Sequence, residues 1–406
     1  MGIRQSRSRM RKHSTQSSRS LCSIPRTSSE HSFQRLWSRT SRRRRSVTSL
    51  TDPYLASRTT WPTPQSEAMF LPEYEVCPKS AERDYKVVHQ INKGAYGQVV
   101  KVERQSDGQI FAMKVLSKLE VLRGEAVKQC KEEASIQTMI SHHPFIVKIH
   151  QTWQNKLNLH IVMEFATHGD LYTLWLLENA FQESAVCIYT AEIAMVLEFL
   201  HNAGIIFRDL KMENILLDHN GHIKLTDFGL SKWLQKNQRT STICGTLQYM
   251  APEILLEEDY THAIDWWSLG VIMYTLLVGR YPIDGAKNHY TMQRKVLQHR
   301  YQPPEHVSKE AGEVLALLLK KNPKERLQAL REFEKLPFYR DFPFEQLLKK
   351  NIAPKNFLRR KLPPTLARKY YDSSSAKRRR KLGQRAHEGL SEFTIENFEW
   401  IRVTEL

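Results

Sequence analysis

The residues best suited to chemistry lie in two short segments near the middle of the 406-residue chain. The segment 207–214 (Phe-Arg-Asp-Leu-Lys-Met-Glu-Asn) places Lys211 two residues after the carboxylate of Asp209 and ends on the amide of Asn214. A second carboxylate, Asp227, follows 13 residues later and opens the sequence Asp-Phe-Gly. Amide and carboxylate oxygens are ligands that Mg²⁺ prefers, and a positioned carboxylate can accept a proton. The two segments therefore combine candidate metal ligands with a candidate base.

A glycine-rich turn and a lysine precede these segments and suit the binding of phosphate. The turn 92–99 contains Gly94 and Gly97 between two strand-like runs, and glycines let backbone N–H groups approach phosphate oxygens closely. Such a turn alone is also typical of an ordinary hairpin. Seventeen residues after Gly97, Lys114 ends an apolar strand, and 19 residues later Glu133 lies on a predicted helix, where it could pair with Lys114.

Taken in order, these motifs resemble the signature set of protein kinases, which continues 24 residues after Asp227 with Ala-Pro-Glu at 251–253. Residues 85–339 look like a eukaryotic protein kinase domain. Thr-Ile-Cys-Gly-Thr at 242–246 is similar to the AGC family of serine/threonine kinases, and within it the chain resembles the ribosomal protein S6 kinase-like branch. The resemblance implies an α+β fold with a β-rich small lobe and a helical large lobe, and ATP and Mg²⁺ bound between the two lobes.

The resemblance assigns roles in phosphoryl transfer to the candidate residues. Lys114, held by Glu133, would grip the α- and β-phosphates, and Asp209 would orient the substrate hydroxyl and accept its proton. Lys211 would meet the γ-phosphate, and together with Thr246 it is typical of serine/threonine kinases and not of tyrosine kinases. The implied Mg²⁺ ligands are Asn214 and Asp227.

The resemblance also implies a nucleotide site made by the glycine-rich turn, the neighbouring strands and the connection between the lobes. Met163 would be the gatekeeper, and Glu164 to Ala166 would form a hinge that binds the adenine edge through backbone groups. The residues implied for the nucleotide are Ile91, Asn92, Lys93, Gly94, Ala95, Tyr96, Gly97, Val99, Ala112, Lys114, Met163, Glu164, Ala166 and Glu213.

Regulation and substrate choice are implied by single residues. Thr242 matches the AGC activation-loop phosphosite, where a phosphate added by an upstream kinase could pair with Arg208 and order the loop; an ordinary loop threonine is the alternative. Asp170 and Glu213 match acidic positions that bind substrate arginines upstream of the target residue, although Thr275 stands where some relatives have a third acid. Protein substrates with Ser or Thr near Arg are therefore expected, and two solvated carboxylates are the alternative.

Departures from the family pattern keep a second function open. Asn92 replaces the first glycine of the turn, and Phe207 replaces the His of His-Arg-Asp. Gln129 stands where many relatives have a His that contacts the activation-loop phosphate. The aromatic residues of 393–400 lack the Phe-x-x-Phe-Ser/Thr-Tyr spacing that ends many AGC kinases. A weakly active or inactive pseudokinase that serves as a nucleotide-regulated scaffold is the competing prediction, although a scaffold has no chemical need of all six catalytic residues.

Composition and patterning place the motifs on a globular core. Hydrophobic residues make up 41% of the chain and aromatic residues 10%, as in globular proteins. Five scattered cysteines without a Cys-x-x-Cys pair argue against a zinc or disulfide framework and for a reducing compartment. No uninterrupted run of about 18 apolar residues occurs, so no membrane-spanning helix is expected. Strands are expected within 85–115 and at 157–165, and helices at 125–140, 183–201 and 266–278.

The two ends of the chain differ from this core. Residues 1–84 are expected to be a disordered, basic Ser/Arg-rich tail followed by a Pro-rich linker, and residues 340–406 an atypical C-terminal extension. Residues 1–50 contain thirteen Lys and Arg and a single acid, Glu30, within a chain of net charge +18. Because the excess positive charge belongs mainly to this tail, the folded part is not expected to bind nucleic acid.

The first residues predict a lipid anchor. Met-Gly-Ile-Arg-Gln-Ser fits the pattern for N-myristoylation of Gly2. One acyl chain anchors a protein only marginally, and the basic residues that follow would supply the second attraction to an anionic membrane. The expected location is cytoplasmic, at the inner face of the plasma membrane; nuclear import through the basic runs 42–45 and 377–381 is the alternative.

Overall fold

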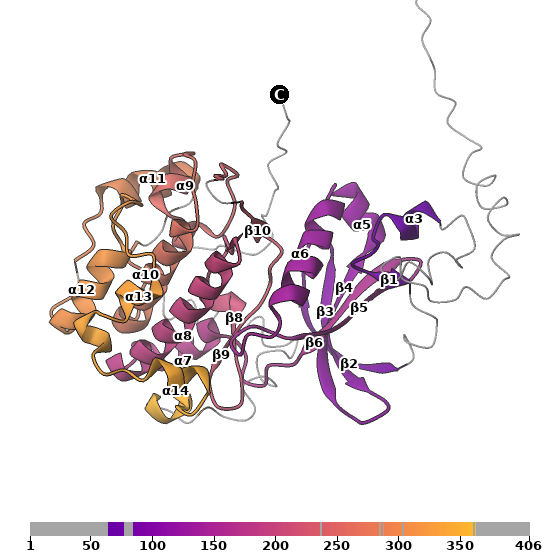
Figure 1. Ribbon diagram of the computed structural model, residues 1–406, viewed down its shortest axis with the longest axis horizontal. Helices are drawn as coiled ribbons and strands as arrows, with labels where there is room; N and C mark the ends of the chain where they lie inside the picture. The colour runs from indigo at the N-terminus through magenta and orange to yellow at the C-terminus, as the bar shows by residue number, and fades with distance from the viewer. Residues whose placement is uncertain are drawn as a thin grey trace, which may run out of the picture. The chain divides into compact units, whose positions relative to one another are not determined.

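The computed structural model describes residues 64–76, 84–235, 238–283, 286, 288–302, 304–359 and 362. All of them belong to the compact unit Val47–Leu406. A β-sheet with adjoining helices is followed along the chain by a mainly helical part (Figure 1). We call residues 64–164 the small lobe and residues 165–359 the large lobe. Gly2, the basic tail and the aromatic residues of 393–400 lie outside the described residues.

The small lobe is built on a six-stranded sheet with the strand order β1-β5-β6-β4-β3-β2. β1 pairs with β5 in parallel, and the remaining pairs are antiparallel. The β-rich runs that the sequence predicts form the hairpins at the β2 edge of this sheet. The strands are β1 (Glu75–Val76), β2 (Tyr85–Lys93), β3 (Gly97–Arg104), β4 (Ile110–Ser117), β5 (Ile149–Gln154) and β6 (Asn158–Glu164).

Helix α6 (Val127–Ile140) packs on the small-lobe sheet. Its buried side chains recur at helical spacing, with Cys130, Glu133, Ala134 and Ile136 on one side, so the face that carries Glu133 is directed inward. A short helix that the sequence analysis does not anticipate precedes it, α5 (Lys118–Arg123), and the side chain of its N-cap Ser117 accepts a hydrogen bond from the Glu120 N–H.

Residues 64–76, which we call the N-terminal segment, correct the prediction that everything up to residue 84 is tail or linker. They form helix α3 (Gln65–Ala68) and strand β1, and Figure 1 shows both beside α5 at the β1–β5 edge of the sheet. Phe70 and Tyr74 are fully buried in a cluster with residues of α6 and the sheet. Prolines suggested a linker, but two aromatic side chains four residues apart supply enough apolar surface to join the core.

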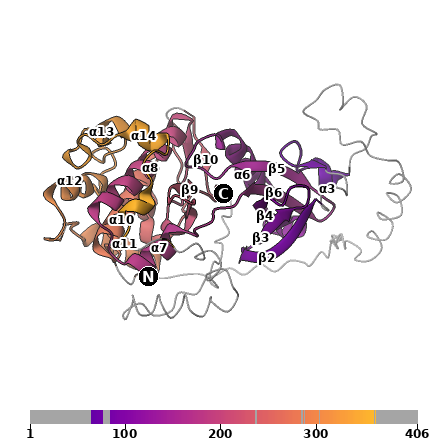
Figure 2. The same ribbon diagram turned by 90° about the horizontal axis from the view of Figure 1, so that it is seen from below.

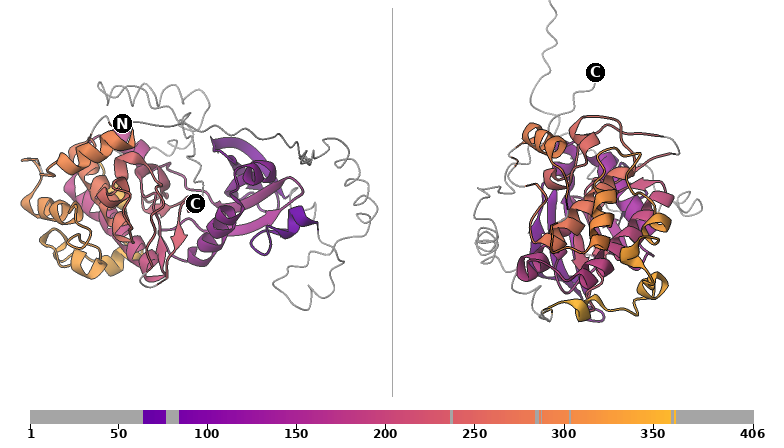
Figure 3. Two further views of the ribbon diagram at one scale, coloured as in Figure 1. Left: turned by 90° about the horizontal axis from the view of Figure 1, so that it is seen from above. Right: turned by 90° about the vertical axis from the view of Figure 1, so that its left-hand side faces the viewer.

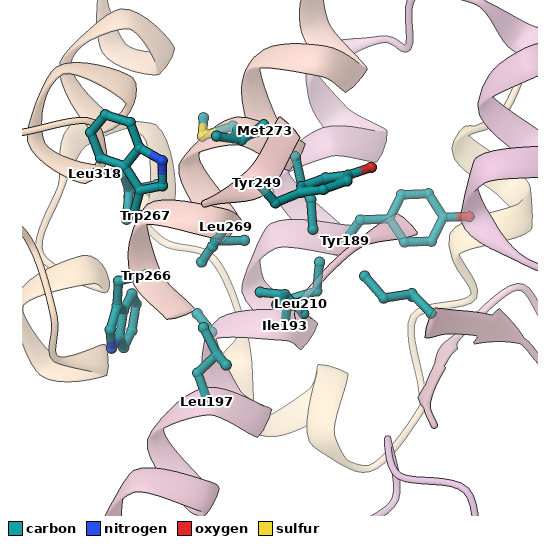
Figure 4. Packing of buried hydrophobic residues seen from close by; sticks show 14 of the residues in the cluster. Tyr189, Ile193, Leu197, Leu210, Tyr249, Trp266, Trp267, Leu269, Met273 and Leu318 are labelled. Carbon is teal, nitrogen blue, oxygen red and sulfur yellow. The ribbon is translucent and has the colours of Figure 1, made fainter. Parts of the chain in front are cut away.

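The large lobe is organised around helices α8 and α10, which pack against each other. Figure 4 shows the centre of this packing, where Leu197 of α8 lies near Trp266 of α10, Ile193 lies near Leu210, and Tyr189 lies near Tyr249. Figures 2 and 3 show that the remaining helices gather around this pair. The helices are α7 (Leu171–Glu178), α8 (Glu183–Asn202), α9 (Pro252–Leu255), α10 (Ala263–Val278), α11 (His289–Gln298), α12 (Lys309–Leu318), α13 (Leu330–Phe333) and α14 (Phe344–Leu348).

The large lobe also contains short strands and single turns of 3-10 helix. β8 pairs with β9 and β7 with β10, all of them in antiparallel orientation. The short elements are β7 (Ile205–Ile206), η1 (Met212–Asn214), β8 (Ile215–Leu217), β9 (Ile223–Leu225), β10 (Lys232–Trp233), η2 (Leu247–Tyr249), η3 (Pro337–Tyr339) and η4 (Pro354–Phe357).

Helix α8 is the one described helix that is long and apolar enough to cross a membrane by length and composition alone. In the structure, 78% of its most apolar stretch is buried inside the protein. Its apolar character is thus explained by its central position in the large lobe. It ends at Asn202, one residue beyond the predicted range 183–201, and the next glycine, Gly204, has a positive φ of 75°.

The C-terminal boundary predicted at residue 339 also needs correction. α14 and η4 follow this boundary, and both contact α8. Leu347 is fully buried, and the Lys350 ammonium lies 2.9 Å from the Asp218 carboxylate. The first 20 residues or so of the expected extension therefore continue the large lobe.

Candidate active site

The glycine-rich turn joins β2 and β3 at the edge of the sheet. The Gly94 N–H donates to the carbonyl of Gly97 at 2.8 Å and closes the turn. A Cβ on Gly97 would lie 1.9 Å from the carbonyl oxygen of Val115 on β4, so only glycine fits there. Asn92, in the place of the family's first glycine, pairs with Val99 within the hairpin and is not among the described residues with positive φ. An asparagine at this position therefore requires no left-handed backbone conformation.

Lys114 on β4 is the point where the sheet, α6 and the Asp-Phe-Gly segment meet. Its Nζ lies 2.5 Å from Oε1 of Glu133 and 3.5 Å from Oδ1 of Asp227. Burial alone favours the neutral amine, but the two carboxylates outweigh it and raise the pKa of Lys114. Lys114 in turn lowers the pKa of Asp227. The predicted ion pair between Lys114 and Glu133 is present, and its lysine is charged.

Asp209 lies at the centre of a hydrogen-bond network in the large lobe. Lys211 Nζ donates to its Oδ2 at 2.6 Å, and Thr246 Oγ1 donates to its Oδ1 at 2.9 Å. Asn214 Nδ2 donates to the Asp209 carbonyl at 3.0 Å and to its Oδ2 at 3.1 Å. Burial raises the pKa of Asp209, and Lys211 and Thr246 oppose that rise. The result is a fixed carboxylate of increased basicity beside a cation, as a proton acceptor requires.

Asp265 of α10 holds the backbone of this catalytic segment from behind. Its carboxylate accepts hydrogen bonds from the N–H groups of Phe207 and Arg208, each at 2.9 Å, and lies 2.9 Å from His201 Nε2. These bonds fix Arg208 at a positive φ of 68°, an uncommon conformation for a residue with a side chain. Asp265 thus braces the backbone of the catalytic segment.

Two further contacts stabilise the scaffold around the site. Arg326 donates from both terminal nitrogens to Glu253, at 2.6 and 2.9 Å, in a buried bidentate pair. Phe207, in place of the family's His, is fully buried and packs edge-to-face on Phe228, with ring centroids 5.1 Å apart. The aromatic packing at this position thus survives the replacement.

Comparisons with known proteins agree with this geometry. Residues 85–338 match the family model described as protein kinase domain. The chain is 42% identical over 299 residues to the human ribosomal protein S6 kinase-related protein, which covers 73% of this chain and 72% of that protein. It is also 36% identical over 283 residues to a RAC family serine/threonine-protein kinase homolog of Dictyostelium discoideum, or 68% of this chain and 63% of that one.

The chain belongs to the protein kinase family. A third relative, atypical protein kinase C of Drosophila melanogaster, is 38% identical over 285 residues, which are 67% of this chain and 47% of that one. The relatives support an AGC kinase of the ribosomal protein S6 kinase-like branch. The protein is a serine/threonine kinase, with ATP as phosphate donor and Mg²⁺ as cofactor.

The described residues fit a magnesium ion of the kind that is shared with phosphates. No group of three or more His, Cys, Asp or Glu side chains is placed to hold a metal in the described part of the chain. Mg²⁺ commonly binds through one or two protein oxygens plus substrate phosphates. Asp227 and Asn214 meet this need, because the N–H of Thr226 next to Asp227 donates to the Asn214 carbonyl at 3.0 Å. Since Asn214 Nδ2 is bound to Asp209, Oδ1 is the atom of the amide suited to a metal.

The predicted nucleotide residues of the small lobe lie along β2, β3, β4 and β6, with one exception, whereas Glu213 lies on η1 of the large lobe. Ala112 lies opposite Met163 in the β4–β6 ladder, next to the hinge. Glu164 at the hinge pairs through its side chain with Lys224 at 2.6 Å, and its backbone N–H donates to the Lys148 carbonyl at 2.9 Å. The exception is Tyr96, whose ring packs against Gly124 and the cluster that contains Phe70.

A hydrogen bond to the backbone of Thr242 fixes the activation loop, while the side chain of this threonine is exposed. Tyr260 donates through its hydroxyl to the Thr242 carbonyl at 2.6 Å, whereas the Thr242 side chain is exposed. Arg208 donates from Nε to the Leu230 carbonyl at 2.5 Å, and its buried Nη1 has no hydrogen-bond partner among the described residues. The exposed side chain of Thr242 and an arginine with one unbonded donor thus lie in the same part of the lobe.

Gln129 has a role that the sequence analysis does not anticipate. Its Nε2 donates to the carbonyl of Gly229 in Asp-Phe-Gly at 2.7 Å and so links α6 to the metal-binding segment. Thr246 was expected only as a marker of serine/threonine kinases, but its hydroxyl bridges Asp209 and Lys211. The spacing of these residues along the chain contains no signal for either contact.

The contribution of the bridging Thr246 hydroxyl to catalysis can be tested by substitution. Thr246→Val removes one hydrogen bond from the base and one from Lys211 while keeping the side-chain volume, so we expect kcat to fall by about tenfold to a hundredfold. Thr246→Ser keeps the hydroxyl and should retain most of the activity. Steady-state kinetics with ATP and a serine peptide measure both variants, and equal kcat values for Val and Ser would contradict the role.

Proposed function

We propose that this kinase transfers the γ-phosphoryl group of ATP to Ser or Thr hydroxyls of proteins at sites that contain arginine. Lys114 holds the phosphates, and Asp209 takes the proton of the attacking hydroxyl while Lys211 neutralises charge on the transferred group. The bond from the γ-phosphorus to ADP breaks and a bond to the hydroxyl oxygen forms. Asn214 and Asp227 would hold Mg²⁺, which would supply further neutralisation of phosphate charge.

The crowding of acidic groups at Glu213 carries the arginine preference. The Glu213 side chain is exposed, but the protein packed around its carboxylate and the nearby charges of Asp170 and Asp209 raise its pKa to about 7, against the opposing charge of Lys211. Asp170 is itself fixed, since its Oδ1 accepts the Thr173 N–H at 2.7 Å at the start of α7. A substrate guanidinium would relieve this repulsion and bind both carboxylates.

One assay on the full chain tests both the phosphate transfer and the role of Asp209 as proton acceptor. We expect phosphate transfer to a serine peptide with an upstream arginine, and a loss of about a thousandfold in Asp209→Asn. The assay is run before and after an upstream kinase has phosphorylated the protein, with Thr242→Ala as control, because we propose that a phosphate at Thr242 engages Arg208. Nucleotide binding without transfer in every preparation would instead favour a nucleotide-regulated scaffold.

The raised pKa of Glu213 predicts a pH-dependent preference. Above about pH 7 the carboxylate is ionised and attracts arginine, whereas below it the group is neutral. The ratio of kcat/KM for an arginine peptide to that for its leucine counterpart should therefore rise about tenfold between about pH 6 and pH 8. Taking the ratio cancels the titration of groups that act on both peptides. A ratio that stays flat, or that keeps its slope in Glu213→Gln, would reject the assignment.

We propose also that the protein is tethered at the cytoplasmic side of an anionic membrane through Gly2 and the basic residues of 1–50. The sequence pattern and the clustered positive charge support this. Because the excess charge lies in this tail, the proposal includes no nucleic-acid partner for the folded part. Protein produced with an N-myristoyltransferase should bind vesicles containing phosphatidylserine, and Gly2→Ala should lose most of this binding. Equal binding by both, or nuclear accumulation of both in cells, would refute the tether.

A further inference from the structure

The N-terminal segment packs on the same helix that supplies Glu133 to the active site. Phe70 and Tyr74 are both fully buried. They share a cluster with Cys130 and Ala134 of α6 and with residues of β4, β5 and β6, and Tyr96 of the glycine-rich turn packs against the same cluster. The segment therefore contacts the helix and the sheet at once.

Polar contacts fix the segment to α6 close to Glu133. Lys131 Nζ donates to the carbonyl of Leu71 at 2.6 Å and lies 3.0 Å from Oε2 of Glu73. Tyr74 donates from its hydroxyl to the Cys130 carbonyl at 3.1 Å. Cys130 and Lys131 precede Glu133 by less than one helical turn, so a displacement of these contacts would displace the glutamate.

The opposite side of the segment is fixed to the sheet. Gln154 of β5 donates from Nε2 to the carbonyls of Glu67 and Tyr74, at 3.0 and 2.6 Å. Lys118 Nζ donates to the Ser66 carbonyl at 2.9 Å, and β1 pairs with β5. Since backbone carbonyls accept most of these bonds, the attachment depends on the path of the segment as well as on its side chains.

We propose that residues 64–76 are a built-in positioning element for catalysis, which holds α6 so that Glu133 reaches Lys114. The segment acts through α6, which carries Glu133 to Lys114 and Gln129 to Gly229. Lys131, Glu73, Phe70 and Tyr74 are then positioning residues. The inference rests on the roles proposed above for Lys114 and Glu133.

Two lysines of α6 provide a matched test in the full chain. Lys131→Met removes the bonds to Leu71 and Glu73, and we expect kcat/KM for ATP to fall by about tenfold. Lys128→Met removes only an exposed pair with Glu132 of the same helix, 3.8 Å apart, and should change activity less than twofold. Thermal melting of both variants verifies that they are folded. Equal activity of the two variants would overturn the proposal.

A double-mutant cycle separates positioning from general destabilisation. If the segment acts through Glu133, Lys131→Met should have almost no further effect on activity in a Glu133→Gln background. Glu73→Gln, on the segment side, should show the same dependence on Glu133. A full tenfold loss that persists in Glu133→Gln would mean that the segment acts by another route and would refute the proposal.

The same cycle distinguishes failure of this inference from failure of the proposed function. Glu133→Gln without any effect on transfer would reject the roles assigned to Lys114 and Glu133. A strong effect of Glu133→Gln with none of Lys131→Met would leave those roles intact and reject only the positioning role of the segment.

Discussion

The ion pair between Lys114 and Glu133 is the interaction on which the rest of the active site depends. Both groups are largely withdrawn from water, and a buried charge left without its partner costs about 3–5 kcal/mol. The pair therefore favours one placement of α6 against the sheet. Asp227 adds a second carboxylate 3.5 Å from the same ammonium, so the metal-binding segment of the large lobe is drawn to the same point.

The large lobe contributes rigidity to this arrangement in a different way. Its catalytic segment has little regular structure, and an irregular backbone holds its shape only when its polar groups are bonded. Asp265 supplies those bonds from α10, a helix whose tryptophans are packed in the core (Figure 4). Buried charges therefore stabilise the two sides of the site in different ways. The ion pair of Lys114 and Glu133 depends on the placement of α6, whereas the Asp265 carboxylate belongs to a helix that is packed in the core of the large lobe.

Much of this site could be predicted from the sequence because its residues occur in short motifs. Asp209, Lys211 and Asn214 lie within six residues, so local spacing already determines their grouping. Contacts between distant segments carry no such signal: Gln129 meets Gly229, and Tyr96 turns toward the α5–α6 junction. The N-terminal segment could not be predicted as part of the core because its prolines are typical of linkers, and only its contacts show that Phe70 and Tyr74 are core residues.

The folded unit extends beyond the limits that its family resemblance would assign to it. The match covers 85–338, yet fully buried side chains lie on both sides of that range, among them Phe70, Tyr74 and Leu347. A protein trimmed to those limits would expose to solvent the apolar surfaces that these residues cover, and such patches promote aggregation. For this kinase, poor solubility of a shortened chain would therefore report on missing parts of the core and not on the quality of the catalytic domain.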